Sequence, residues 1–107
     1  MKSNEELNNE LNIDVNQLRK AALVLRAVNH SLRQQILKLI FQKQKITVTE
    51  IYVKLRLEQS VASQHLAILR KAGFVDTTRD GKFIYYSVNE QRLQEVHKLV
   101  EDLLKKD

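Results

Sequence analysis

The chain has 107 residues, of which 43% are hydrophobic, and its formal net charge is +5. This composition suits one folded domain rather than a disordered tail, and the longest apolar run, Ala21 to Leu25, is far too short to span a membrane. The absence of cysteine excludes disulfides and thiolate metal sites and is typical of a reducing compartment, so we expect a cytoplasmic protein.

The charge is unevenly distributed along the chain. Residues 1–15 hold Lys2 against four acidic side chains, a net charge of −3, so the remaining 92 residues carry +8. We interpret residues 1–14 as a polar, acidic extension of the first helix and residues 15–107 as the main domain. A basic body favours a polyanionic partner, with nucleic acid first and an acidic membrane surface second.

Apolar residues near the N-terminus predict one helix that begins somewhere between Asn4 and Asn16. They recur every three or four residues, and most keep a heptad: Leu7, Leu11, Val15, Leu18, Ala22 and Leu25. A stripe this narrow indicates that the helix faces another helix.

Three further helices are expected before residue 75. The second follows an N-cap at Asn29 and buries a wide apolar face, made of Leu32, Ile36, Leu37, Ile40 and Phe41. A capping box, Thr47-Val48-Thr49-Glu50, opens a short third helix that ends near Arg56. The fourth is expected to end at Gly73 in the left-handed conformation, with Phe74 making the hydrophobic contact that usually follows.

Beyond residue 75 the apolar period changes to that of a β-strand. The runs 75–79 and 82–88 flank Asp80-Gly81, a pair typical of a type I′ hairpin turn, in which both central residues need a positive φ. Asn89 is expected to cap a last helix with a heptad-like stripe of Leu93, Val96, Val100 and Leu103. The predicted fold is therefore mainly α with a small β-hairpin.

The third and fourth helices are separated by only three residues, Arg56, Leu57 and Glu58. Two helices joined so tightly, with a hairpin directly after them, predict a winged helix-turn-helix. The outward face of the fourth helix begins with short polar side chains: Gln59, Ser60, Ser63 and Gln64. Amides and hydroxyls of this kind suit base edges in a DNA major groove, whereas an ordinary solvated face, the alternative, more often carries long charged side chains.

Other polar side chains are expected to contact the DNA backbone. These predicted contacts at phosphates and in the wing are Thr47, His65, Arg70, Lys71, Arg79 and Lys82. Arg79 and Lys82 flank the hairpin turn, from which they reach a neighbouring phosphate or the minor groove. His65 falls in the centre of the inward arc, which favours a partly buried imidazole over a base contact and leaves a phosphate contact as the alternative.

The segment LRLEQSVASQHLAILRKAGFV, from Leu55 to Val75, and the following TTRDGKFIYYSV resemble the ArsR family of bacterial winged-helix repressors. The resemblance covers about residues 20–104. It implies a homodimer, formed through the first and last helices, that binds a palindromic operator and releases it when an effector binds. The predicted dimer residues are Leu11, Val15, Leu18, Ala22, Leu25, Leu93, Val96, Val100 and Leu103.

Three features depart from the pattern of this family. Arg56 occupies a turn position that commonly holds glycine, so either Arg56 is strained in a left-handed conformation, at a cost on the order of 1 kcal/mol, or the turn is slightly different. Glu58 replaces the usual serine-like cap and brings a negative charge near the DNA, where it either weakens binding or faces a cytosine amine. The ligands of the metal-sensing members are missing, so no metal and no cofactor are expected.

One metal alternative remains, because His97 and Glu101 lie four residues apart on one helix face. In a two-fold dimer, two such pairs offer nitrogen and oxygen ligands for Zn²⁺. The simpler interpretation is an ordinary surface pair.

The leading hypothesis is a sequence-specific transcriptional regulator, expected to be a repressor. Its predicted partners are double-stranded DNA and a second copy of itself, with no membrane partner and with an effector that the sequence does not reveal. The alternative is a winged-helix module that contacts a protein and binds DNA weakly or not at all, which Glu58 favours. An enzyme is disfavoured, because the chain has no thiol, no glycine-rich phosphate loop and no nucleophile–histidine–carboxylate arrangement.

Overall fold

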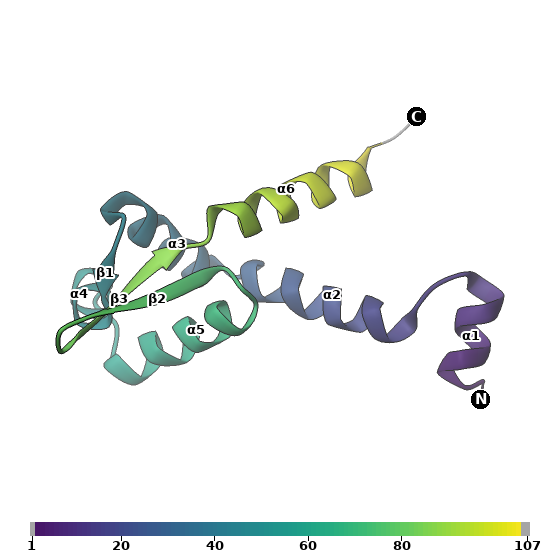
Figure 1. Cartoon of the computed structure of the whole chain (residues 1–107), viewed down its shortest axis with the longest axis horizontal. Helices are drawn as coiled ribbons and strands as arrows, with labels where there is room; N and C mark the ends of the chain where they lie inside the picture. The colour runs from purple at the N-terminus through teal and green to yellow at the C-terminus, as the bar shows by residue number, and fades with distance from the viewer. Residues whose placement is uncertain (1, 106–107) are drawn as a thin grey trace.

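The computed structural model describes residues 2–105, which form six helices and a three-stranded antiparallel sheet. In chain order these are α1 (Asn4–Leu11), α2 (Val15–Val28), α3 (Ser31–Lys43), β1 (Ile46–Thr47), α4 (Val48–Leu55), α5 (Gln59–Lys71), β2 (Val75–Asp80), β3 (Phe83–Val88) and α6 (Glu90–Leu104). Figure 1 shows α3, α4, α5 and the sheet gathered into a body, from which α2 and α6 project. The small α1 lies at the far end of α2.

The core of the body comes from helices and strands together. Its largest fully buried side chains are Ile36, Ile40, Ile46, Ile51, Leu66, Leu69, Phe74 and Val75. The predicted apolar face of α3 is confirmed in part, because Leu39 is buried there whereas Phe41 is 50% exposed. No helix within residues 2–105 is both long enough and apolar enough to cross a lipid bilayer.

The sheet has the strand order β1–β3–β2. The sequence did not predict β1, a strand of two residues in which Ile46 pairs with Tyr86. So short a strand has no recognisable period in the sequence, and it forms because β3 offers a free edge beside the start of α4.

The hairpin between β2 and β3 is confirmed, but its predicted turn is shifted by one residue. Asp80 pairs with Phe83, so the two turn residues are Gly81 and Lys82 rather than Asp80 and Gly81. Of these two, only Gly81 has a positive φ, at 63°. That is the pattern of a type II′ turn, which places glycine first, and not of the predicted type I′ turn.

The predicted first helix is present as α2, whose start lies between Asn4 and Asn16, but its apolar stripe does not extend back to Leu7, because α1 is a separate helix that meets α2 at a corner. Asn12 ends α1 in the left-handed conformation, and Asp14 caps the start of α2. The corner is closed by the amide of Val15, which donates to Oδ1 of Asn8 at 2.8 Å. Leu11 therefore does not continue the apolar stripe of α2.

Most of the predicted helix caps are confirmed. Thr47 and Glu50 form the reciprocal capping box of α4, and Asn89 caps α6 through its side chain. The exception is Asn29, which is the C-cap of α2 and not the N-cap of α3. The N-cap of α3 is His30, whose side chain makes no capping hydrogen bond.

The end of α5 has the geometry predicted for Gly73. Its φ is 86°, its amide donates to the carbonyl of Arg70 at 3.0 Å, and the amide of Phe74 donates to the carbonyl of Leu69 at 2.9 Å. These two hydrogen bonds define a Schellman motif, and the buried Phe74 supplies its hydrophobic contact. The motif fixes where α5 stops and β2 starts.

We expect Gly73→Ala to lower the free energy of unfolding by about 1–2 kcal/mol, because a side chain at this φ is strained. A Cβ atom at Gly73 also lies 3.3 Å from Nε of Arg92. Gly81→Ala is the matched control, since its φ is also positive but nothing lies within 4 Å of a Cβ atom there. Urea denaturation measures both, and a Gly73→Ala variant as stable as the wild type would contradict the prediction.

Candidate nucleic-acid interface

A rigid turn holds α5 against α4. Arg56 is the C-cap of α4 with a φ of 56°, which confirms the left-handed conformation expected where this family commonly has glycine. The amide of Leu57 donates to the carbonyl of Tyr52 at 2.9 Å, and the Leu57 side chain packs against the core. The angle between the two helices is therefore set by hydrogen bonding and by burial.

The two faces of α5 have different environments. Ala62, Leu66 and Leu69 are fully buried against the body, whereas Ile68 is 40% exposed. The four side chains expected to contact bases are all exposed at the start of the helix: Gln59, Ser60, Ser63 and Gln64. The structure thus brings these four onto one outward surface, supported from below by the core.

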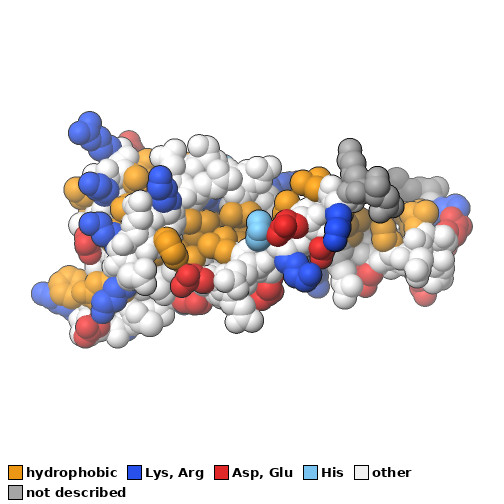
Figure 2. Space-filling view, turned by 90° about the horizontal axis from the view of Figure 1, so that it is seen from above, with side chains coloured by type: hydrophobic (Ala, Val, Ile, Leu, Met, Phe, Trp, Pro, Cys, Tyr) orange, Lys and Arg blue, Asp and Glu red, His pale blue; other side chains and the backbone are white. Residues whose placement is uncertain are grey.

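Basic side chains continue this surface toward the end of α5 and the hairpin tip. Arg70, Lys71, Arg79 and Lys82 are exposed, and within residues 2–105 none of them forms an ion pair. Nε of Arg79 donates to the carbonyl of Gly81 at 3.2 Å, which holds the guanidinium at the turn. Figure 2 shows many Lys and Arg side chains at the end of the molecule that carries the hairpin tip.

Two residues predicted to contact the DNA backbone, Thr47 and His65, already have hydrogen-bond partners within the chain. The Thr47 hydroxyl accepts from the Glu50 amide at 3.3 Å and donates to Oε1 of Glu50 at 3.0 Å. His65 is half-buried, as its place in the inward arc favours. Glu58 is the exposed N-cap of α5, its side chain makes no capping hydrogen bond, and within residues 2–105 its carboxylate forms no ion pair.

His65 belongs to a small cluster that joins α5 to α3 and to the end of α2. Nε of Arg33 donates to Nδ1 of His65 at 3.1 Å, and Nη1 of Arg33 donates to the carbonyl of Ala27 at 2.9 Å. The centroid of the His30 ring lies 5.0 Å from the centroid of the His65 ring. Sequence reasoning missed Arg33 as a positioning residue, because nothing in a helical pattern shows which distant acceptor an arginine will reach.

Burial lowers the pKa of His65 below its usual 6.5, and the nearby His30 and Arg33 lower it further. Arg33 can only donate, so Nδ1 of His65 must accept and the imidazole is neutral in the folded protein. We therefore expect the contribution of His65 to stability to be complete above pH 6.5 and to be lost as the pH falls below that value.

Urea denaturation between about pH 5 and pH 7.5 checks this prediction, with His65→Gln as the control that cannot be protonated. The wild type should lose more stability than the control on acidification, because the unfolded chain binds the proton more readily. Equal pH dependence in the two proteins would show that His65 plays no such part.

The C-terminal end of α5 is hydrogen-bonded to α6. Nε of Arg92 donates to the carbonyl of Ala72, the C-cap of α5, at 3.1 Å. This bond satisfies a carbonyl that the helix itself leaves free. It was also missed in the sequence, for the same reason as Arg33, and it connects a helix expected to form the dimer with the helix expected to enter DNA.

The apolar side chains predicted for the dimer lie on α1, α2 and α6 and are unevenly covered in the single chain. Leu11, Leu18 and Leu103 are 62%, 55% and 70% exposed, whereas Leu93 and Val96 pack against the core of their own chain. Figure 2 shows hydrophobic side chains gathered over the middle of one face of the molecule. The remaining predicted dimer residues are exposed or half-buried on these helices: Val15, Ala22, Leu25 and Val100.

His97 and Glu101 contact each other on the surface of α6. Nε2 of His97 lies 2.8 Å from Oε1 of Glu101, and both side chains are largely exposed. Within residues 2–105 no third histidine, cysteine or carboxylate joins them in a group that could hold a metal ion. The single chain therefore offers two ligands at most at this position.

The helices α3, α4 and α5, the tight turn before α5 and the β-hairpin after it define a winged helix-turn-helix protein. Its exposed polar face lies on α5, the second helix of the helix-turn-helix. Comparison with known families shows that residues 30–77 match the bacterial regulatory proteins of the arsR family. An uncharacterised HTH-type transcriptional regulator of Methanocaldococcus jannaschii is 36% identical over 84 residues, which are 78% of this chain and 94% of the relative. The chain belongs to the ArsR family.

Two further relatives have named activities. The crystal structure of the transcriptional repressor PagR of Bacillus anthracis has a TM-score of 0.64 and 32% sequence identity, covering 78% of this chain and 95% of PagR. The transcriptional activator HlyU of Vibrio cholerae is 32% identical over 84 residues, covering 78% of this chain and 77% of HlyU. The protein is therefore a DNA-binding transcriptional regulator rather than an interaction module without DNA, and its family is a non-enzymatic class.

Proposed function

We propose that two copies of the chain form a homodimer that binds a palindromic site in double-stranded DNA and represses transcription there. The observation that carries this proposal is the exposed, uncharged polar face at the start of α5, lying over the fully buried Leu66 and Leu69. A face held this firmly keeps its shape when it enters a groove, so its amides and hydroxyls are already in position.

The side chains divide into those that distinguish bases and those that bind phosphates. Amides and hydroxyls contact base edges, and Gln64 pairs with N6 and N7 of an adenine. The base contacts are Gln59, Ser60, Ser63 and Gln64, and the phosphate contacts are Arg70, Lys71, Arg79 and Lys82. His65 completes the backbone contacts through its Nε2–H, because Arg33 occupies only Nδ1. Thr47 joins them when its hydroxyl proton turns from Oε1 of Glu50 to a phosphate oxygen.

The dimer forms through the projecting helices α2 and α6, whose exposed apolar side chains become buried against the second copy. Leu18 and Leu103 are each more than half exposed, and Ala22, Leu25 and Val100 extend their stripes. A two-fold axis between the α2 helices presents two copies of α5 to one side of the DNA, about one helical turn apart.

Repression is proposed from the similarity to the repressor PagR, while HlyU is named an activator. The same contacts with DNA serve either outcome, because the position of the binding site relative to the promoter decides it. Since a prokaryotic promoter is the proposed target, the proposed place of action is the cytoplasm.

Selection of bound fragments from random duplex DNA, together with sedimentation of the free protein, tests the proposal. We expect an enriched inverted repeat with half-sites about one helical turn apart, and a free protein of twice the chain mass. Absence of any enriched sequence at low salt, or a monomer that binds a single half-site, would overturn it.

Two substitutions separate the proposed roles. Gln64→Ala should lose about 1–3 kcal/mol of discrimination at one base position in each half-site, because a bidentate pair is removed. Lys82→Ala should weaken binding to all sequences alike. Titration of both variants against the selected site and a one-base variant of it checks this, and a Lys82→Ala protein with altered base preference would contradict the assignment.

A further inference from the structure

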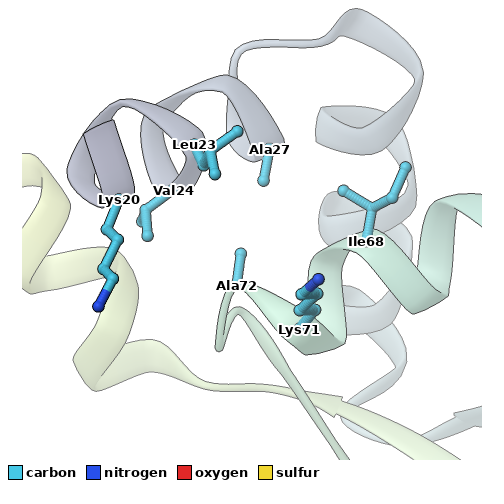
Figure 3. Close-up of a pocket in the computed structure, with 7 residues that line it drawn as sticks. All are labelled: Lys20, Leu23, Val24, Ala27, Ile68, Lys71 and Ala72. Carbon is cyan, nitrogen blue, oxygen red and sulfur yellow. The ribbon is translucent and has the colours of Figure 1, made fainter. Parts of the chain in front are cut away.

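An apolar hollow of about 360 Å³ lies between α2 and the C-terminal half of α5. It is lined by Leu23, Val24 and Ala27 of α2, by Ile68 and Ala72 of or beside α5, and by Lys20 and Lys71. In Figure 3 the apolar side chains of α2 face those of α5 across this space, and the two lysine side chains lie on either side of Ala72. Leu23, one of the lining residues, is 55% exposed.

The chemistry of the lining suits one class of ligand. Hydrophobic walls with a few polar groups that fix orientation are typical of sites for small molecules, and the volume lies within their usual range. Within the described part of the chain neither Lys20 nor Lys71 pairs with a carboxylate. A ligand with an apolar body and one anionic group satisfies the walls and the lysines together.

The proposed dimer leaves this hollow uncovered. On α2 the dimer residues Leu18, Ala22 and Leu25 lie on one face of the helix, about half a turn away from the residues that line the hollow. The lining therefore faces the body of its own chain, beside α5, rather than the second copy.

We propose that the hollow binds a small amphipathic monocarboxylate and that such a ligand is the effector of this regulator. The effector role rests on the proposed function, because Lys71 is also a proposed phosphate contact. A carboxylate beside Lys71 competes with the DNA phosphate for its ammonium group, and its negative charge repels the DNA backbone. Binding in the hollow therefore weakens binding to DNA.

Equilibrium dialysis of the full chain against decanoate, well below its micelle concentration, tests the site without DNA. We expect one decanoate per chain, and at least five-fold weaker binding of decanol, which lacks the charge. Leu23→Glu should weaken decanoate binding at least ten-fold and the matched Leu23→Gln much less, because only the first places a like charge in the hollow. Lys20→Gln should weaken it about three-fold, whereas Lys54→Gln, a control on α4, should not.

Several outcomes would overturn the site. These are the absence of saturable binding, equal binding of decanol and decanoate, or equal effects of Leu23→Glu and Leu23→Gln. Sedimentation of the same variants covers the remaining possibility. If Leu23→Glu dissociates the dimer and Leu23→Gln does not, the hollow is filled by a second copy of the chain and not by a ligand.

The effector role is measured separately, by titrating the selected DNA with and without decanoate. We expect decanoate to weaken DNA binding by the wild type at least five-fold and to leave the Leu23→Glu variant unchanged. If the protein binds no DNA even without decanoate, the proposed function fails while the dialysis result still decides the site. If DNA binds and decanoate changes nothing, the effector role is wrong.

Discussion

Raising the salt concentration from about 50 to 200 mM is expected to weaken binding to the selected DNA site by a factor of about 10³ to 10⁵. Arg70, Lys71, Arg79 and Lys82 are exposed and without ion pairs in the described residues, so a dimer presents eight such side chains to phosphates. Each phosphate contact releases bound counterions, which gives a slope of about −7 in a plot of log affinity against log salt. Fluorescence anisotropy with a labelled duplex measures this slope.

The control for this prediction changes the hairpin alone. An Arg79→Ala, Lys82→Ala double variant removes four of the eight proposed contacts of the dimer, so its slope should be shallower by about 3 to 4. Affinity that is independent of salt in the wild type would contradict phosphate binding altogether. An unchanged slope in the double variant would remove the hairpin from the interface and leave the contacts of α5.

Leu66→Ala is expected to lower the free energy of unfolding by about 2–5 kcal/mol, because it leaves a cavity beneath α5. Leu66 is fully buried and belongs to the core cluster that also includes Ile36, Ile51 and Phe74. Because the helix that carries Gln64 packs through this side chain, DNA affinity should fall as well.

Ile68→Ala is the matched control for Leu66→Ala. It truncates a side chain of the same size on the same helix, but Ile68 is 40% exposed. The free energy of unfolding is therefore expected to fall by much less than in Leu66→Ala. Urea denaturation at a fixed protein concentration compares the two variants. Equal losses would show that α5 is not held in the way that its burial indicates.

Features that depend on a few neighbouring residues were predictable from the sequence. The Thr47–Glu50 capping box and the Schellman motif at Gly73 are local hydrogen-bonding arrangements, and both are present. The short turn before α5 follows from the spacing of the apolar residues on either side of it. The polar face on the first turn of α5 was predictable in the same way, because the helical period assigns each residue to one face of the helix.

Predictions failed where two local preferences competed. Asn12 and Asp14 favour a left-handed end and a new N-cap, and these outweighed the apolar period that had placed Leu7 to Leu25 on one helix. At the hairpin, the pairing of Asp80 with Phe83 moved the turn by one residue, because cross-strand contacts and not the Asp-Gly pair set the register.

The helices α2 to α6, the β-hairpin and the outward polar face of α5 followed from the amino-acid sequence, because period and capping act over a few residues, whereas β1 and the separate α1 did not. Other features depend on residues that lie 20 to more than 40 positions apart in the sequence. These are the hydrogen bond from Arg33 to His65, the hydrogen bond from Arg92 to Ala72, and the hollow between α2 and α5. Long side chains reach many acceptors with similar energy, so only the packing of the whole chain selects one. The tertiary structure alone therefore decided how α5 is held at its middle and at its C-terminal end, and where a ligand has room to bind.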